Sequence, residues 1–184
     1  MALQYAGVQV EHREIELRNK SQSMLQVSPK GTVPVLCVDG HVLDQSIDIM
    51  QWALRVSDPD GWAVLDESVA QAWIKKNDEL FKGLLDQYKY PNRHSELDQA
   101  VVLTDAMDVM LKPMEAALES SQHLLGDKMT WVDVAIFPFI RQFMMVDQQG
   151  FEALPLPQIR RWLHQHIESE LFIAVMAKHP TWRD

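Results

Sequence analysis

The stretch from Lys30 to Leu36, which reads Lys-Gly-Thr-Val-Pro-Val-Leu, restricts the fold of this chain more than any other. Pro34 stands where an apolar run begins. Because proline lacks a backbone N–H donor, a central strand is not expected to run through this position. X-Pro bonds are also where nearly all cis peptide bonds of proteins occur. We therefore predict a cis bond before Pro34, with the N–H and C=O of Val33 turned outward.

The residues that follow predict a binding site beside this bond. Cys37 to His41 read as a strand, a tight turn and a second short strand, and Ser46 opens a helix expected from Ile47 to Val56. The free N–H groups and the positive dipole at a helix start suit a carboxylate. The outward backbone of Val33 could pair with an extended peptide as an added strand does. The combination favours a small, anionic peptide as ligand.

Thr32-Val33-Pro34, the strand–turn–strand, and Gln45-Ser46 at the helix start resemble the glutathione-binding half of the glutathione S-transferase family. The resemblance implies that Val33 pairs backbone to backbone with the cysteinyl unit of glutathione, beside Pro34. It also implies that Gln45 and Ser46 hold the γ-glutamyl carboxylate. The alternative is an ordinary strand after a loop, followed by a helix that Ser46 caps.

Composition bounds the class of protein. With 184 residues, 47% of them apolar and 23% charged, the chain suits one compact unit or two small domains with a real core. No apolar run is long enough to span a bilayer, and Met1 to Tyr5 do not begin a signal peptide. A single cysteine and no export signal predict a cytoplasmic protein. The net charge of −9 argues against nucleic acid and anionic membranes as main partners.

The first third of the chain predicts mixed structure, and the rest predicts helices. Residues 1–7 read as the end of a helix that closes at Gly7, and Val8 to Ile15 alternate as a strand does. Ser57 to Gly61 form an unbroken run of turn residues, which predicts a linker. We predict a first domain over residues 1–56, a linker over 57–65 and an all-helical domain over 66–184.

Apolar spacing predicts five helices in the second domain. The first ends near Pro91, and the second is long, begins after Ser95 and contains Pro113, which should kink or shorten it. A third, strongly apolar helix runs from Thr130 to about Val146. A fourth starts after Pro157, and a fifth covers residues 171–178.

Thr130 and Asp133 have the spacing of a capping box at the start of the third helix. The Thr130 hydroxyl can accept from the N–H of Asp133, whose carboxylate can reach back to the N–H of Thr130. The same Thr-x-x-Asp before an apolar helix is found in the second domain of glutathione transferases, which adds to the resemblance. On either interpretation the predicted role of the pair is in folding, not in catalysis.

Few residues are candidates for chemistry. The seven histidines show no spacing typical of metal ligands, so no metal site is predicted, and Cys37 reads as a small buried hydrophobe. Tyr88, Tyr90 and Arg93 lie at the end of the first long helix, where the family holds its second substrate, an apolar electrophile. We take them as a possible electrophile pocket. The alternative is that these aromatic residues only pack.

The resemblance also implies that a catalytic residue is missing. The family activates the glutathione thiol with a Tyr, Ser or Cys just after the first strand or at the start of the first helix, because the thiolate is the nucleophile. Met1 to Gly7 resemble the second half of that helix, so the first strand would lie upstream of Met1. Tyr5 stands too far along the helix to match, and no residue is assigned as catalytic.

The expected fold is an α/β thioredoxin-like domain, incomplete at its start, followed by an all-α domain, as in glutathione S-transferases. The resemblance implies a protein that binds glutathione as substrate. If the missing N-terminal residues exist, it would transfer glutathione to an apolar electrophile, as a homodimer. The alternative from another class is a glutathione-binding or protein-interaction module without turnover.

Overall fold

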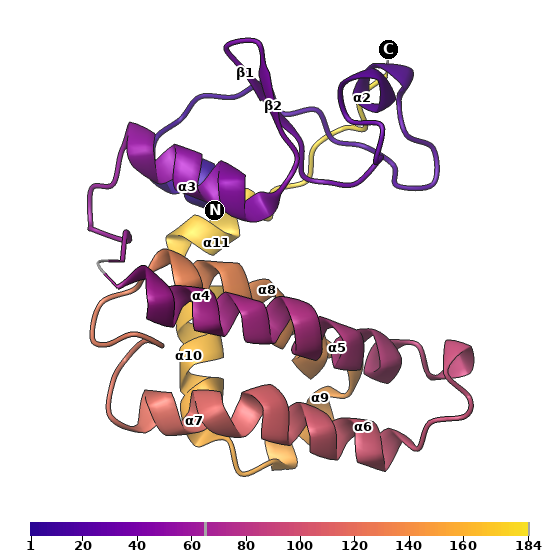
Figure 1. Ribbon diagram of the computed structural model, residues 1–184, viewed down its shortest axis with the longest axis vertical. Coiled ribbons are helices and arrows are strands. Elements are labelled where there is room, and N and C mark those ends of the chain that lie inside the picture. The colour runs from indigo at the N-terminus through magenta and orange to yellow at the C-terminus, as the bar shows by residue number, and fades with distance from the viewer. Residues whose placement is uncertain (65, 184) are drawn as a thin grey trace. The chain divides into compact units, whose positions relative to one another are not determined.

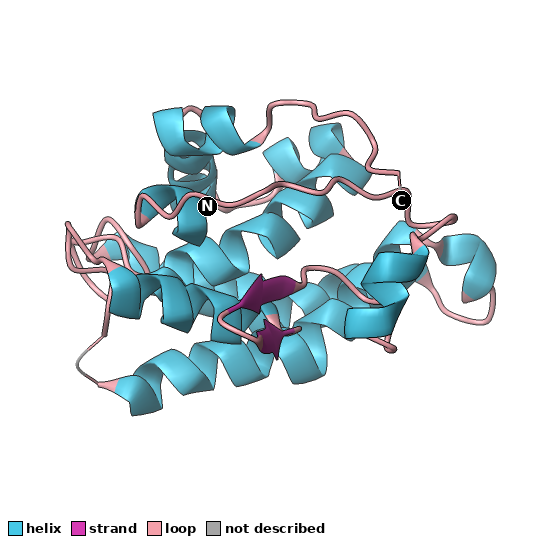
Figure 2. Cartoon of the chain, turned by 90° about the horizontal axis from the view of Figure 1, so that it is seen from above, coloured by secondary structure: helices cyan, strands magenta, loops and turns pink. Residues whose placement is uncertain are grey.

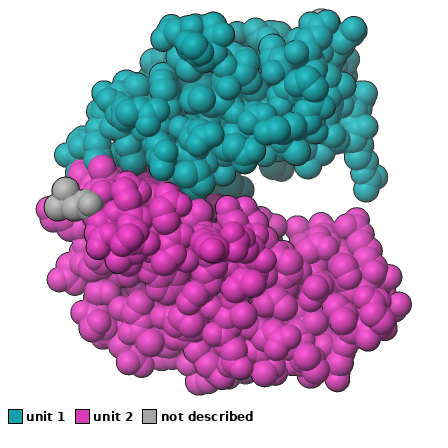
Figure 3. Space-filling model, viewed as in Figure 1, with its two compact units in different colours: residues 1–60, 170–184 teal, residues 61–169 magenta. Residues whose placement is uncertain are grey.

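The computed structural model describes residues 1–64 and 66–183, which form two compact units (Figures 1 and 3). Unit 1 comprises Met1–Asp60 and Glu170–Asp184, and unit 2 comprises Gly61–Ser169. The last helix of the chain is thus grouped with the N-terminal residues, whereas the sequence assigned it to the helical domain. The domain bounds 1–56 and 66–184 stay a prediction, and part of the predicted linker 57–65 lies outside the described residues.

Unit 1 holds a β-hairpin among short helices (Figure 2). Its elements are α1 (Ala2–Tyr5), α2 (Gln22–Val27), β1 (Leu36–Val38), β2 (His41–Leu43), α3 (Ser46–Val56) and α11 (Glu170–Val175). β1 and β2 pair antiparallel, with Leu36 opposite Leu43 and Val38 opposite His41. Asp39 and Gly40 connect them at φ values of 48° and 78°, the left-handed conformation that two-residue hairpin turns require. The predicted strand, turn and strand are confirmed.

The predicted strand from Val8 to Ile15 is wrong. In the described residues these positions form only one bridge, between Glu14 and Thr181. A strand exists only where a neighbouring segment takes up its backbone groups, and here the neighbour is a short part of the C-terminal segment. Val10, which the alternation would bury, is 45% exposed.

One burial prediction in unit 1 also needs correction. Cys37 is exposed, because β1 belongs to a hairpin of two strands rather than to a covered sheet. α3 buries Ile49, Met50 and Ala53 and packs on α1.

Unit 2 is helical in the part that the structure describes. Its elements are α4 (Glu67–Lys76), η1 (Asn77–Phe81), α5 (Lys82–Lys89), η2 (Pro91–Arg93), α6 (Gln99–Ala106), η3 (Met107–Leu111), α7 (Lys112–Glu119), α8 (Trp131–Val146), α9 (Gln148–Ala153) and α10 (Pro157–Ile167). α6 begins after the Asp98 cap rather than at Ser95, and α9 was not predicted. The core is rich in large fully buried side chains, among them Trp131, Phe137, Phe143 and Trp162.

The effect of Pro113 has a local explanation. The second long helix changes to a π-turn over η3, and Pro113 stands in the first turn of α7 directly after it. The backbone at Leu111 and Lys112 keeps α-helical dihedral angles, so α7 continues η3 without a break. A π-turn therefore precedes Pro113 within a continuous helix, and the helix is not shortened there. Within residues 1–64 and 66–183, no helix has the length and apolar character needed to cross a membrane.

Candidate functional site

The peptide bond between Val33 and Pro34 is cis, as predicted. Val33 is 49% exposed. Within the described chain, neither its N–H nor its C=O has a hydrogen-bond partner. The backbone at this position therefore offers one donor and one acceptor to an extended ligand.

The start of α3 offers further donors. Gln45 is the N-cap residue, and the first helical bond runs from the N–H of Ile49 to the C=O of Gln45 at 3.1 Å. The N–H groups of Ser46, Ile47 and Asp48 have no partner among the described residues. Gln45 and Ser46 are exposed, and Gln45 makes no side-chain cap bond. A carboxylate would find both backbone and side-chain donors here.

The hairpin brings these two groups of donors to the same end. Its register places Leu36 opposite Leu43, so Val33 and Gln45 both lie beyond the open end of the strands. Lys30 Nζ and Asp44 Oδ2 form an ion pair 2.9 Å apart at that same end. Neither Lys30 nor Asp44 was predicted from the sequence to belong to the site. The sequence does contain a signal for this ion pair, namely one basic and one acidic residue on opposite sides of the predicted hairpin.

In unit 2, Tyr88 packs against the core rather than standing free. Its ring stacks on Phe143 at 4.6 Å between centroids. Burial, followed by the charge of Asp147, raises the pKa of Tyr88. The ring thus packs on one neighbour, and the place of Tyr88 in the electrophile pocket stays a prediction.

Tyr90 and Arg93 present a more accessible surface. The guanidinium carbon of Arg93 lies 4.2 Å from the centroid of the Tyr90 ring, and Lys89 Nζ lies 5.2 Å from it. Arg93 is exposed. An aromatic face with cations beside it suits an apolar molecule that carries electron-withdrawing or anionic groups. The pocket itself stays a prediction.

Tyr5 has a different role from that of a thiol activator. Its hydroxyl donates to Asp58 Oδ1 at 2.8 Å and accepts from the N–H of Asp60 at 2.7 Å. Burial is the largest of the influences that raise the pKa of Tyr5 to about 12. The hydroxyl thus ties α1 to residues 58–60 of unit 1.

The capping box at the start of α8 is present, as predicted. Asp133 is fully buried and accepts more bonds than the box requires. Oδ2 accepts from the N–H and the hydroxyl of Thr130, and Oδ1 accepts from the Leu124 N–H and the Trp162 indole N–H. One carboxylate therefore joins the start of α8 to the preceding loop and to α10. Among the residues that the structure describes, no cluster of three or more His, Cys, Asp and Glu could hold a metal ion.

Two comparisons with families agree with this architecture. Residues 1–59 match the family described as "Glutathione S-transferase, N-terminal domain", and residues 90–170 match "Glutathione S-transferase, C-terminal domain". The chain belongs to the glutathione S-transferase family. It has the fold of that family, a thioredoxin-like N-terminal domain and an all-helical C-terminal domain. Because the N-terminal match begins at residue 1, it does not confirm the predicted loss of a first strand.

Curated members of the family match over most of this chain at low identity. Glutathione S-transferase U19 of Arabidopsis thaliana is 26% identical over 182 residues, covering 92% of this chain and 79% of its own. Maleylacetoacetate isomerase of Dictyostelium discoideum is 22% identical, covering 91% of this chain and 81% of its own. These relatives carry the names of different reactions, so membership of the glutathione S-transferase family does not by itself identify the reaction.

Solved structures show the same fold. BphK, a bacterial glutathione S-transferase, superposes with a TM-score of 0.81 at 21% identity, covering 95% of this chain and 90% of its own. A family member from Pseudomonas fluorescens pf-5, solved with two glutathione molecules bound, superposes with a TM-score of 0.77 at 16% identity, covering 94% and 84%. At identities this low, the likeness shows that the chain shares the fold of these glutathione S-transferases.

Proposed function

We propose that this chain binds glutathione at the open end of the β1–β2 hairpin. The N–H and C=O of Val33 pair with the cysteinyl unit, and Gln45 and Ser46 at the start of α3 hold the γ-glutamyl carboxylate. The observation that carries the proposal is that Val33 is exposed and that its backbone N–H and C=O have no hydrogen-bond partner in the described chain. The donors at the start of α3 support it, because an anionic ligand gains both helix-dipole and hydrogen-bond energy there.

The proposed reaction is the transfer that gives the family its name. The glutathione thiolate attacks an electrophilic carbon of an apolar substrate, a carbon–sulfur bond forms, and the leaving group departs with its electron pair. The thiol proton goes to solvent. The role of thiol activator is assigned to no described residue. Tyr88, Tyr90 and Arg93 are proposed to contact the electrophile, and a cytoplasmic homodimer is proposed as the working form.

Retention on immobilised glutathione tests the binding site. Gln45→Ala/Ser46→Ala should weaken retention about tenfold, because a lost charge-assisted bond costs about 1.5–3 kcal/mol. Gln51→Ala/Ser57→Ala is the matched control. It removes one glutamine and one serine side chain at other positions, within α3 and at its C-terminal cap. The control should keep the retention of the parent. Equal retention of all three proteins, or none by the parent, would contradict the site.

Turnover separates the transferase from a binding module without activity. A retained protein that conjugates glutathione to an activated aryl chloride, with halide released in step with thiol loss, supports transfer. In that case Arg93→Ala should raise the KM for the aryl chloride about threefold to tenfold and leave the KM for glutathione unchanged. Retention without turnover would favour the alternative, a glutathione-binding or protein-interaction module.

A further inference from the structure

Two histidine rings in the interior of unit 2 have nitrogens without hydrogen-bond partners. His166, on α10, is fully buried, and His123 belongs to the α7–α8 loop, residues 120–130, with 12% of its side chain exposed. Among the residues that the structure describes, His123 Nδ1 and His166 Nε2 are buried and have no partner. The two rings meet edge to face, with their centroids 6.1 Å apart. Buried polar atoms are normally hydrogen-bonded, so this pair is a candidate for a role other than packing.

The carboxylate of Asp133 links the loop to the helices, and its Oδ1 has more donors nearby than it binds. Oδ1 accepts from the N–H of Leu124 at 2.9 Å and from the indole N–H of Trp162 at 3.0 Å. His123 Nδ1 lies 3.8 Å from the same oxygen, which is too far for a hydrogen bond. Because His123 directly precedes Leu124, a small turn of its ring would bring Nδ1 to the oxygen that holds the Leu124 N–H.

The charge of His123 decides which donor this oxygen accepts. A neutral ring leaves Oδ1 to Leu124 and Trp162, as in the structure. A protonated ring donates from both nitrogens, and a hydrogen bond from a cation to a carboxylate is about twice as strong as one from a neutral donor. The Trp162 indole is fully buried in the core and stays in place, so the Leu124 N–H is the donor that a protonated His123 displaces.

His166 is the neutral neighbour in this arrangement. Its Nδ1 lies 2.8 Å from the C=O of Trp162, and because a carbonyl only accepts, Nδ1 carries the hydrogen. Burial lowers the pKa of His166, and His123 adds to the lowering, although the Trp162 carbonyl and Asp133 act in the opposite direction. His166 therefore presents the lone pair of Nε2, and not a second positive charge, to a protonated His123.

The other charged groups around the loop bind elsewhere or are exposed. The groups that face the His123 ring are Asp133 from α8 and His166 from α10. Arg161 of α10 donates from Nη2 to two carbonyls at the end of α7 and in the loop, at 3.2 and 3.0 Å. The remaining charged residues at the end of α7 and in the loop are exposed: Glu119, Asp127 and Lys128.

We propose that His123 is a proton-operated switch of the α7–α8 loop. When His123 takes up a proton from solvent, its ring turns onto Asp133 Oδ1 and the N–H of Leu124 loses its acceptor. The turn that the His123 N–H closes on the Gly126 C=O at 2.8 Å then detaches from α8. The capping box remains, because Thr130 donates to the other oxygen, Oδ2. The loop thus opens while α8 stays folded, whether or not the proposed glutathione site exists.

Amide exchange of Leu124, measured by NMR and corrected for the pH dependence of the chemical exchange rate, tests the switch. From about pH 7.5 to about pH 5.5, the protection of Leu124 in the parent should fall about tenfold or more, since the open loop holds one more proton. The protection of Val134 and Ile136, inside α8, should change by less than about twofold. The nitrogen shift of His123 Nδ1 should titrate with the same midpoint as the protection of Leu124.

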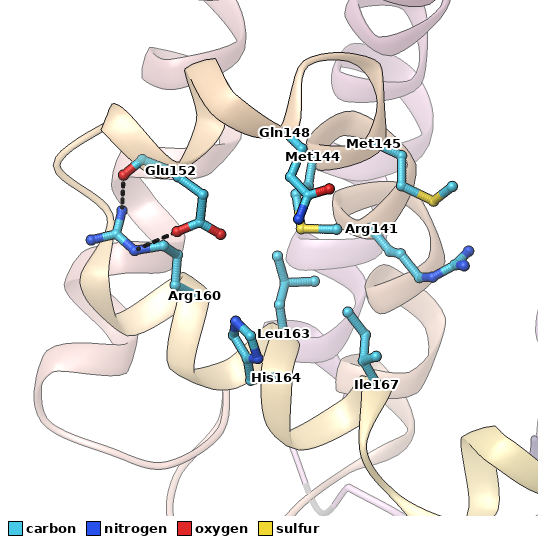
Figure 4. Close-up of a pocket in the computed structure, with 9 residues that line it drawn as sticks. All are labelled: Arg141, Met144, Met145, Gln148, Glu152, Arg160, Leu163, His164 and Ile167. Carbon is cyan, nitrogen blue, oxygen red and sulfur yellow. Dashed lines mark hydrogen bonds and ion pairs between the residues drawn. The ribbon is translucent and has the colours of Figure 1, made fainter.

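Two variants identify the residue that carries the proton. His123→Gln keeps a polar side chain that takes up no proton, so its Leu124 protection should not depend on pH. His164→Gln is the matched control and should behave as the parent. His164 Nδ1 also lies 3.8 Å from a carboxylate, that of Glu168, but it is exposed, and Figure 4 shows it at a hollow that α8, α9 and α10 form.

Several results would overturn the proposal. They are Leu124 protection that does not change with pH in the parent, an unaltered pH dependence in His123→Gln, and equal losses at Leu124 and inside α8. If His123→Gln does not fold, the parent alone decides, because different midpoints for the His123 nitrogen and for Leu124 protection would also contradict the switch.

Discussion

At the scale of single residues, Asp133 has the largest predicted effect on stability. Asp133→Ala removes the acceptor of four buried donors, among them the indole N–H of Trp162. Each buried donor left without a partner costs about 1–3 kcal/mol, so we expect the free energy of unfolding to fall by about 3 kcal/mol or more. Denaturant unfolding measures the loss.

The control for Asp133 is a cap on the surface. Asp147 also caps a helix, but its bond to the Gly150 N–H is exposed, and the described residues give its carboxylate no second hydrogen bond. Asp147→Ala should therefore cost about 0.5–2 kcal/mol, the range of ordinary caps. Equal losses for the two variants would show that the additional donors of Asp133 add nothing to stability.

The burial of His166 predicts how the free energy of unfolding depends on pH. It is fully buried, and this burial lowers its pKa from the ordinary value of 6.5, although the Trp162 carbonyl and Asp133 act in the opposite direction and His123 adds to the lowering. The unfolded chain therefore binds this proton at a higher pH than the folded chain does. The contribution of His166 to the free energy of unfolding is fully present above about pH 6.5. It is lost as the pH falls from there toward the pKa of His166 in the folded protein.

Unfolding titrations between pH 8 and pH 5 measure this effect. A single group contributes a slope of up to about 1.4 kcal/mol per pH unit below its unfolded pKa. His166→Gln should reduce the slope of the parent in this range. His164→Gln, an exposed histidine on the same helix, should keep it. A parent slope that His166→Gln leaves unaltered would contradict the assignment.

At the scale of elements, the segment around Glu14 forms its contacts with the C-terminal segment and not with a strand of a sheet. The N–H of Trp182 donates to the C=O of Glu14 at 2.6 Å, and the Arg13 guanidinium lies 4.3 Å from the Trp182 ring. His12 and His179 add a ring contact at 4.1 Å. These contacts join sequence-distant parts of unit 1 without a regular sheet.

Amide exchange of Trp182 measures this attachment. Arg13→Ala removes the cation over the ring, an interaction of about 0.5–1 kcal/mol at an exposed site, so exchange should become about twofold to fivefold faster. Arg18→Ala is the control, since no ring contact of Arg18 occurs in the described chain. Unaltered exchange in Arg13→Ala would show that the backbone bond alone holds the segment.

At the scale of the whole molecule, the two units differ in how much they bury. The described sheet of unit 1 has two strands of three residues, and its buried side chains are mostly small. Unit 2 buries several tryptophan and phenylalanine side chains completely. Two-stranded sheets are marginal by themselves in water, so unit 1 should be the less stable part.

Hydrogen exchange by mass spectrometry measures this difference. Peptides from residues 8–43 should exchange at least about a hundredfold faster than peptides from residues 131–146, because local opening requires less free energy there. Saturating glutathione should slow exchange at residues 33–50 and leave 131–146 unaltered. Equal protection of both segments in the free protein would contradict the prediction.

Features that depend on a few neighbouring residues were predictable from the sequence. The cis bond before Pro34, the hairpin turn at Asp39-Gly40 and the capping box of Thr130 and Asp133 each follow from local dihedral preferences or from hydrogen bonds within a few residues. Apart from α9 and η2, the described helices of unit 2 fall within segments that apolar spacing predicted as helical. The place of the candidate site on the hairpin and on α3 also came from these signals.

Only the tertiary structure decided the features that need a partner far along the chain. Val8 to Ile15 had the pattern of a strand, but the described chain brings only the C-terminal segment alongside it. Asp133 receives the Trp162 indole from 29 residues away, and Cys37 is exposed because its strand lies in a two-stranded hairpin. A periodic pattern states which face of a segment is apolar. Which segment covers that face, or forms hydrogen bonds with the edge of a strand, depends on how distant segments pack. The free energy of that packing is a property of the whole fold.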